Sequence, residues 1–189
     1  MHRSLRLFVA ITPPADLSEA LLQTLANSGL ALPPHRLIPP EDQHLTLAFI
    51  GETRQKELRS VVESVDRACA GFSAFALVPE AFITIPTPAD GGPPRLIAAR
   101  TSAPSPLIEL QRRLAMRLTT PKRNGHRARF LPHLTLARYA HGQTSDQIDV
   151  ALTPALLPPW AVGRITLFSS ALRADRAVYE VLHEARLTS

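Results

Sequence analysis

Four letters, His-Leu-Thr-Leu, occur twice in this chain of 189 residues, at positions 44–47 and 133–136. Each copy has a threonine two places after its histidine, so that His44 is matched with Thr46 and His133 with Thr135. Histidine titrates near neutral pH, and one ring can therefore act as a base while another acts as an acid. Such a pair suits phosphodiester cleavage, in which a base activates water, an acid protonates the leaving alkoxide and hydroxyl or arginine donors hold the phosphate oxygens.

Both copies lie in segments that predict β-strands, over 44–51 and 133–140. Side chains alternate between the two faces of a strand, so the histidine and threonine of each copy share one face and the two leucines share the other. The leucines can then enter the core. If the two strands face each other, an imidazole and a hydroxyl line each wall of a groove.

Positive charge is concentrated around the second copy. The chain has a net charge of +5, and the segment 110–145 contains eight Lys and Arg residues but no Asp or Glu. A field of one sign favours an anionic ligand, although frequent use of arginine and a solvated helix face are an alternative explanation. We assign the arginines at 112, 113 and 117 to such a helix face. The arginines expected to face the ligand are Arg127, Arg129 and Arg138.

The remaining pattern predicts an α+β fold with mainly antiparallel sheet, because strands and helices are mixed without a regular βαβ order. The predicted helices are 13–29, 54–71 and 105–119. The predicted strands are 5–11, 44–51, 72–85, 94–101, 133–140, 161–172 and 177–187. The segment 145–159 is expected to form a short helix followed by a Pro-rich connection.

Composition excludes several classes of protein. Hydrophobic residues make up 45% of the chain, enough for a buried core. No apolar run reaches the roughly 18 residues of a membrane span, and the short apolar stretch 7–11 predicts a first strand rather than a signal peptide. A cytoplasmic location is therefore expected. Cys69 is the single cysteine, which excludes an intramolecular disulfide and a cysteine metal cage, and it is expected to be buried on a helix.

Several stretches resemble one known family over nearly the whole chain: "RLFVAITPP", "HLTLAFIGE", "RFLPHLTLAR", and "LFSSAL" before "AVYEVLHEARL". Together with the paired His-x-Thr-x motifs they are similar to the RNA 2′,3′-cyclic phosphodiesterase branch (LigT-like or 2′-5′ RNA ligase-like) of the 2H phosphoesterase superfamily. The resemblance implies a single bilobal domain over residues 1–189, with two mainly antiparallel sheets facing a central basic groove, helices outside and pseudo-two-fold symmetry.

The resemblance also implies a reaction and roles. The reaction is opening of an RNA 2′,3′-cyclic phosphate to a 2′-phosphate without metal or cofactor. His44 matches the proton donor, His133 the proton acceptor, and Thr46 and Thr135 the phosphate-holding hydroxyls. Arg138 matches a further phosphate-binding residue, but its odd offset from His133 requires a bulge or a strand end after Leu136.

Further contacts and alternatives stay open. Phe49 has the same offset from His44 and is a candidate for stacking on RNA, with a core position as the alternative. Arg127 and Arg129 are candidate RNA contacts. The expected partners are RNA ends or nucleoside 2′,3′-cyclic phosphates, and a monomer is expected. The alternative functions are a 2′-5′ RNA ligase using the same histidines, a non-catalytic RNA-binding module, and a metal site, which no nearby ligand pattern supports.

Overall fold

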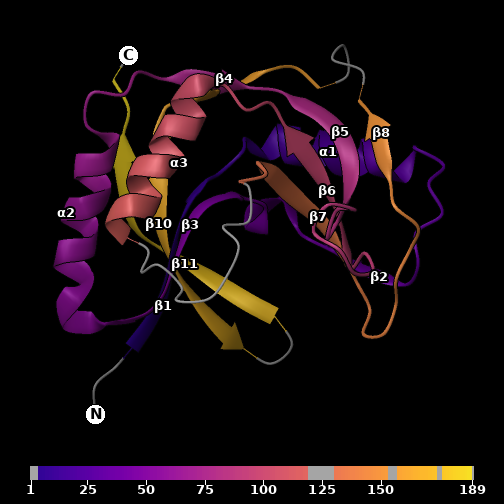
Figure 1. The fold of residues 1–189 in the computed structure, drawn as a ribbon, viewed down its shortest axis with the longest axis horizontal. Helices are drawn as coiled ribbons and strands as arrows, with labels where there is room; N and C mark the ends of the chain where they lie inside the picture. Colours follow the sequence, from indigo (N-terminus) through magenta and orange to yellow (C-terminus); the bar gives the residue numbers. More distant parts are fainter. Residues whose placement is uncertain (1–3, 119–129, 153–156, 174–175, 189) are drawn as a thin grey trace.

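Two antiparallel sheets each carry one copy of the repeated motif, as Figure 1 shows. The computed structural model describes residues 4–118, 130–152, 157–173 and 176–188. The four-stranded sheet has the order β11 (Arg176–Arg186), β10 (Arg164–Arg173), β1 (Ser4–Ile11) and β3 (Leu45–Arg54). The five-stranded sheet has the order β2 (His35–Leu37), β7 (His133–Tyr139), β6 (Leu96–Thr101), β5 (Pro79–Ile85) and β8 (Asp149–Ala151). A separate strand pair joins β4 (Phe75–Leu77) to β9 (Trp160–Val162).

Three α-helices cover these sheets: α1 (Ala15–Ala26), α2 (Leu58–Cys69) and α3 (Ser105–Leu118). Short 3₁₀ turns at Pro40–Asp42 (η1) and Gln55–Glu57 (η2) precede β3 and α2. In α1 the leucines at helical spacing, Leu17, Leu21 and Leu25, form the buried face. The helix ends at Ala26 rather than at Gly29, because Asn27 closes its last turn through a backbone bond to Gln23.

Two of the three helices, α1 and α3, pack on the sheet that they do not directly follow in the chain. The helix α3 follows β6 of the five-stranded sheet, yet it packs on α2 and on β3 of the other sheet. Figure 1 shows α2 and α3 together over the four-stranded sheet, while α1, which follows β1, lies beside the five-stranded sheet. One continuous set of buried residues includes side chains from both sheets and all three helices. The expected α+β fold with antiparallel sheets and outer helices is therefore confirmed.

The two motif strands have equivalent neighbours. β1 pairs with β3, and β6 pairs with β7, both antiparallel. Ala10 of β1 lies opposite Thr46, and Ala98 of β6 lies opposite Thr135. The same small residue therefore stands beside the threonine in each half, as pseudo-two-fold symmetry requires.

Four expectations about secondary structure need correction. The strand expected over 161–172 is divided, because β9 pairs with β4 whereas β10 pairs with β1 and β11 in the four-stranded sheet. The short helix expected within 145–159 is wrong for the described part, because residues 149–151 add to β5 as the edge strand β8; residues 153–156 lie outside the description. The strand expected over 72–85 is divided, since β4 pairs with β9 and β5 pairs with β6 and β8. The segment 35–37, which lies outside the predicted helices and strands, forms β2 because β7 offers it an open edge.

Two further expectations concern burial and membranes. Cys69 is buried at the end of α2, and burial raises the pKa of its thiol to about 12. Such a thiol stays protonated at neutral pH and is unsuited to nucleophilic chemistry. None of the helices described is long and apolar enough to cross a membrane.

Candidate active site

The two histidines of the repeated motif have the same hydrogen bond. Nδ1 of His44 lies 2.8 Å from the carbonyl oxygen of Asp42, and Nδ1 of His133 lies 2.8 Å from that of Leu131. A carbonyl oxygen can only accept, so Nδ1 carries the hydrogen in both rings. In the neutral form Nε2 of each ring is then the basic nitrogen. The segments before the two strands, η1 and residues 131–132, thus hold both histidines in the tautomer with hydrogen on Nδ1.

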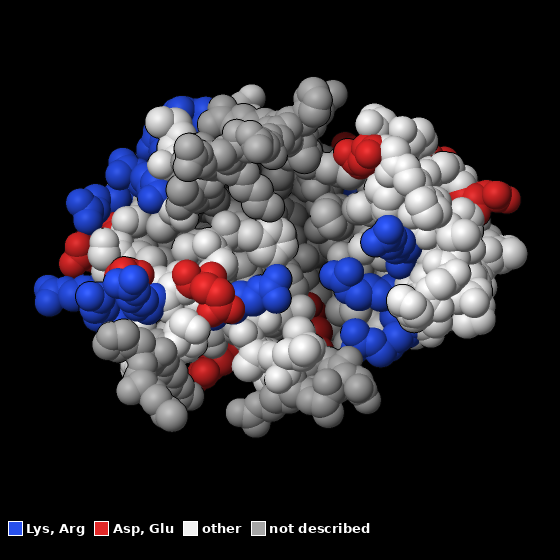
Figure 2. Space-filling view, turned by 60° about the horizontal axis from the view of Figure 1, so that its bottom comes forward, with Lys and Arg blue, Asp and Glu red and all other residues white. Residues whose placement is uncertain are grey.

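The leucines of the motif are buried as expected, and they turn the histidines and threonines to the opposite face. Leu45, Leu47, Leu134 and Leu136 are all at most 3% exposed. His44, Thr46, His133 and Thr135 are half-buried. We call the space between these two half-buried faces the groove. Figure 2 shows a hollow at the middle of the molecule.

The two threonine hydroxyls are available to a ligand. Within the described residues neither Thr46 nor Thr135 makes a hydrogen bond through its side chain. Other strand threonines behave differently: the Thr84 hydroxyl donates to Gln147 at 2.9 Å and the Thr53 hydroxyl to the Gly51 carbonyl at 3.2 Å. Because neither hydroxyl is used in a hydrogen bond within the described protein, the pair at 46 and 135 is suited to donate to an oxyanion in the groove.

A β-bulge in each motif strand explains the odd offset of Arg138. The register against β6 moves from Thr135 to Ala137, which leaves Leu136 as the extra residue of β7. The register against β1 moves in the same way from Thr46 to Ala48, which leaves Leu47 as the extra residue of β3. After the bulge the alternation is shifted by one, so the fifth residue after each histidine returns to the groove face.

The result is that Arg138 and Phe49 occupy equivalent places. Arg138 lies opposite Leu96 on the face that also carries His133 and Thr135, and it is exposed. Phe49 lies opposite Phe8, and 70% of its side chain is exposed. The core position considered for Phe49 is therefore wrong.

Each bulge is held by a hydrogen bond to its extra residue. The carbonyl of Leu47 accepts from Nε2 of Gln111 on α3 at 3.3 Å. The carbonyl of Leu136 accepts from the backbone N–H of Ile38, just after β2, at 2.7 Å. A buried carbonyl without a partner would cost free energy, so these bonds stabilise the shifted alternation.

Burial lowers the pKa of both histidines. The positive charge of Arg138 lowers both values further, and the charge of His133 also lowers the pKa of His44. The hydrogen bonds from Nδ1 to Asp42 and Leu131 act in the opposite direction and raise the pKa values. The two rings and the guanidinium therefore lie close enough to act on one another, in a site that favours neutral imidazole before an anion binds.

The surroundings of His44 are aromatic. Its ring centroid lies 4.9 Å from that of Phe8, 5.0 Å from that of Tyr179 in an edge-on arrangement, and 6.3 Å from that of Phe168. Phe49 extends this cluster, 6.3 Å from Phe8. Phe8, Phe168 and Tyr179 were not predicted as site residues. The alternation of side chains in the first strand and in the last two strands is the signal that could have indicated them.

The opposite wall, on the five-stranded sheet, is basic. Arg100 lies across from His133, but Asp149 at 3.2 Å and Glu80 at 3.9 Å neutralise it. Arg36 of β2 lies directly across from Arg138 and is exposed. Figure 2 shows Lys and Arg atoms on the right-hand side of the hollow. Arg36 was not predicted as a site residue, because no strand was predicted for its segment.

The structure describes all of the predicted site residues except two. Arg127 and Arg129 lie outside the described residues. Among the residues that are described, no group of three or more His, Cys, Asp or Glu side chains could hold a metal ion. The donors that the site offers are two imidazoles, two hydroxyls and guanidinium groups, which are suited to an anion.

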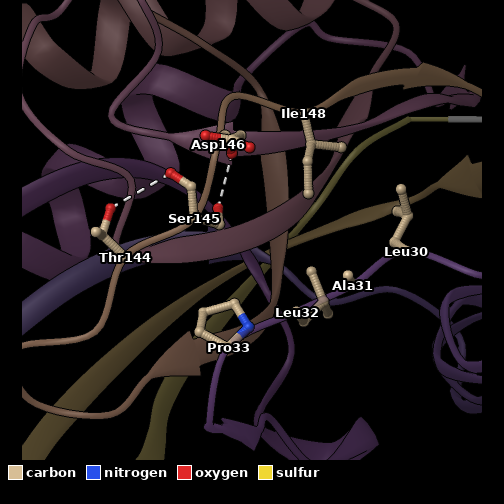
Figure 3. A pocket seen from close by; sticks show the side chains of 8 residues that line it. All are labelled: Leu30, Ala31, Leu32, Pro33, Thr144, Ser145, Asp146 and Ile148. Carbon is tan, nitrogen blue, oxygen red and sulfur yellow. Dashed lines mark hydrogen bonds between the residues drawn. The ribbon is translucent and has the colours of Figure 1, made fainter.

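A second hollow, of about 670 Å³, lies between residues 30–33 after α1 and residues 144–148 after β7, and neither His44 nor His133 lines it. Figure 3 shows that its polar side chains bond locally, with the Thr144 hydroxyl on the Ser145 carbonyl and the Ser145 hydroxyl on the Asp146 carbonyl. It is open and contains no histidine or arginine, and we assign it no chemistry.

Two facing sheets, each with a histidine and a threonine on its groove face, define the class of two-histidine phosphoesterases. Comparison with known families agrees: residues 12–173 match the model of the 2′-5′ RNA ligase superfamily. The chain belongs to this superfamily.

Individual relatives are distant but similar over long ranges. The chain is 24% identical to an RNA 2′,3′-cyclic phosphodiesterase of Thermotoga maritima, over 96% of this chain and 95% of the relative. It is also 24% identical to an RNA 2′,3′-cyclic phosphodiesterase of Geobacillus stearothermophilus, over 85% of this chain but 51% of that relative. The chain thus spans about half the length of the Geobacillus protein.

Solved structures support the same fold. The crystal structure of TT0787 of Thermus thermophilus is 26% identical, with a TM-score of 0.74 over 96% of this chain and 97% of that one. Escherichia coli LigT complexed with NADP⁺ is 25% identical, with a TM-score of 0.73 over 99% of this chain and all of that one. LigT has also been crystallised with 3′-AMP; that chain is 22% identical and shows the fold alone.

Proposed function

We propose that this protein opens RNA 2′,3′-cyclic phosphate ends to 2′-phosphomonoester ends by acid–base catalysis with His44 and His133. The observation that carries the proposal is the pair of identical Nδ1–H tautomers, which present a basic Nε2 from each motif strand. Relatives named RNA 2′,3′-cyclic phosphodiesterases support the choice of substrate. We further propose that residues 1–189 act as one bilobal unit.

The proposed step uses both rings at once. Nε2 of neutral His133 takes a proton from water, whose oxygen attacks phosphorus. The bond between phosphorus and O3′ breaks, and Nε2 of protonated His44 gives its proton to O3′. The products are a 3′-hydroxyl and a 2′-phosphomonoester, and the two protons balance. The assignment of donor and acceptor rests on the family resemblance.

Phosphate binding prepares the acid. Burial lowers the pKa of His44, which disfavours its protonated form in the empty groove. A phosphate anion close to the ring favours the protonated form and raises that pKa again. The hydroxyls of Thr46 and Thr135 and the guanidinium of Arg138 are proposed to donate to the non-bridging oxygens, where negative charge moves in the transition state.

The test of the reaction is incubation with a nucleoside 2′,3′-cyclic phosphate and identification of the product as the 2′- or 3′-monophosphate. Conversion to the 2′-monophosphate is expected, and the 3′-product or no turnover would contradict the proposal. His44→Ala and His133→Ala should each lower the rate about 10²- to 10⁴-fold. His35→Ala is the matched control, since His35 has the same Nδ1 bond to a carbonyl two residues earlier but is exposed on β2.

A substrate with a good leaving group tests the roles. A nitrophenyl phosphodiester needs no proton on its leaving oxygen, so His44→Ala should lose much less rate with it than with the cyclic phosphate. His133→Ala should lose as much with both. The opposite pattern would exchange the two roles.

A second candidate function is 2′-5′ RNA ligation, which the description of the matched superfamily favours. In that reaction a 5′-hydroxyl would replace water as the nucleophile that gives its proton to His133, its oxygen would bond to phosphorus, and O3′ would leave with the proton from His44. Incubation of RNA ends bearing a 2′,3′-cyclic phosphate with 5′-hydroxyl ends, followed by product sizing, distinguishes joining from hydrolysis. The monomeric state and the cytoplasmic location expected from the sequence stay predictions.

A further inference from the structure

Two arginines stand side by side on the basic wall without acidic partners. Arg36 of β2 and Arg138 of β7 are directly paired across the antiparallel strands. Residues opposite each other in this way have Cβ atoms about 4.5–5.5 Å apart, and like charges there are destabilising. Within the described part of the chain neither guanidinium makes an ion pair or hydrogen bond. The nearby Arg100, by contrast, has two carboxylates.

The register shows that Arg36 belongs to the groove face. On β6, which has no bulge here, alternation puts Leu96, Ala98 and Arg100 on one face. Their partners on β7 are Arg138, Thr135 and His133, in that order. Arg36 shares the face of Arg138, its own partner. The groove wall thus continues one strand beyond β7, to the edge of the sheet.

Arg36 is farther from the reacting position than Arg138. It stands about 4.8 Å farther out, the spacing of neighbouring strands. In agreement, Arg138 lowers the pKa of both site histidines, whereas Arg36 is not among the groups that shift either. This position favours an anion other than the phosphate between His44 and His133 as the partner of Arg36.

We propose that Arg36 binds a second phosphate of the substrate, the one on the 5′ side of the terminal nucleoside. This inference rests on the proposed function. An RNA chain that ends in a 2′,3′-cyclic phosphate continues only in the 5′ direction, so any further phosphate lies on that side. The second anion also removes the repulsion between Arg36 and Arg138, which the empty site tolerates. Arg36 would then select phosphorylated or longer ends over bare nucleoside 2′,3′-cyclic phosphates.

The experiment compares Arg36→Gln with the wild type on three substrates that differ in the 5′ position. These are a nucleoside 2′,3′-cyclic phosphate, its 5′-phosphorylated form, and a dinucleotide ending in the cyclic phosphate. The expected loss in kcat/KM is about tenfold for the last two, the size of one charged hydrogen bond, and less than twofold for the first. Arg36→Lys should restore part of the loss.

Other outcomes overturn the inference. An equal loss on all three substrates would make Arg36 part of the reacting-phosphate site or of the fold. A loss on the dinucleotide alone would indicate contact with the next nucleoside instead of a phosphate, and no loss would remove the contact. The matched control is Arg59→Gln, which removes the same charge from an exposed position on α2 paired with Glu63.

Binding separates this inference from the proposed reaction. Fluorescence anisotropy with a labelled dinucleotide carrying a 2′-phosphate end measures affinity without turnover. Arg36→Gln should weaken binding about tenfold and reduce the slope of log K against log salt by about 0.7, the value for one phosphate contact on a single strand. If the wild type cleaves none of the three substrates, the proposed reaction fails, and unchanged binding by Arg36→Gln would still refute the phosphate contact.

The thermal midpoint of Arg36→Gln distinguishes a ligand-binding role of Arg36 from a structural one. Removal of one of two opposed positive charges should leave the thermal midpoint unchanged or slightly raised. A clear fall in the midpoint of Arg36→Gln would show that Arg36 serves the fold.

Discussion

Replacement of Arg138 by Gln should shift the pH dependence of kcat/KM to higher pH. The positive charge of Arg138 lowers the pKa of His44 and of His133. The acid limb of the profile follows loss of the proton from the base, and the alkaline limb follows loss of the proton from the acid. Because removal of the guanidinium raises both pKa values, both limbs should move in the same direction.

The size of the shift follows from Coulomb's law. If the guanidinium and an imidazolium are taken as unit charges about 7 Å apart, they interact by about 0.6 kcal/mol in bulk water and by about 2.4 kcal/mol at an effective dielectric constant of 20. One pKa unit corresponds to about 1.4 kcal/mol. Since Arg138 is exposed, water screens its charge, and the lower estimate, about half a pH unit, is expected. The maximum rate should also fall about 10- to 100-fold, because a charged hydrogen bond to phosphate is lost.

The assay is kcat/KM for a nucleoside 2′,3′-cyclic phosphate from pH 4 to pH 9 at constant ionic strength. Because the rings interact, the two limbs report values of the pair rather than of single residues. Arg138→Lys retains the charge and should leave the limbs in place, as should Arg59→Gln on α2. Limbs that stay in place in Arg138→Gln, or move to lower pH, would refute the electrostatic coupling.

Three further outcomes are expected. Activity should persist in excess EDTA, since imidazoles, hydroxyls and guanidinium groups supply the acid, the base and the anion donors; abolition by EDTA with rescue by a divalent ion would indicate a metallophosphoesterase. Phe49→Ala should raise KM for RNA ends about tenfold, because stacking on a base is lost. The urea midpoint should stay unchanged, because 70% of the side chain is exposed. A large loss of stability would show that Phe49 supports the fold instead of binding RNA. Leu134→Ala should lower the free energy of unfolding by about 2–5 kcal/mol in urea titration, because Leu134 is 0% exposed. The control is Leu172→Ala, since the Leu172 side chain is 82% exposed. Equal losses of stability in the two variants would contradict the assignment of the core.

Alternation alone predicted the orientation of the motif strands. Leu45 and Leu134 are buried and the histidines face the groove, because a strand with one buried face allows only one orientation. The bulge needed for Arg138 was also anticipated, but its twin in β3 was not. A bulge depends on partners far away in the sequence, here Gln111 and Ile38, and the local pattern carries no signal for them.

The groove walls were the least predictable part. The aromatic side chains around His44 come from the first and the last two strands, and only the sheet order β11–β10–β1–β3 brings them together. Arg36 was missed for a related reason. Residues 35–37 lie between two pairs of prolines, and so short a segment gives no strand pattern of its own. They form a strand only because β7 has an open edge.

The order of the strands in the four-stranded sheet has a consequence for synthesis of the protein. In this sheet β1 is translated before either motif, but the sheet is completed by β10 and β11 at residues 164–186. Both histidines are therefore translated well before Phe168 and Tyr179, which surround one of them. A nascent chain that already contains both motifs lacks one wall of its site, and catalytic competence should arise only when the final strand pair docks onto β1.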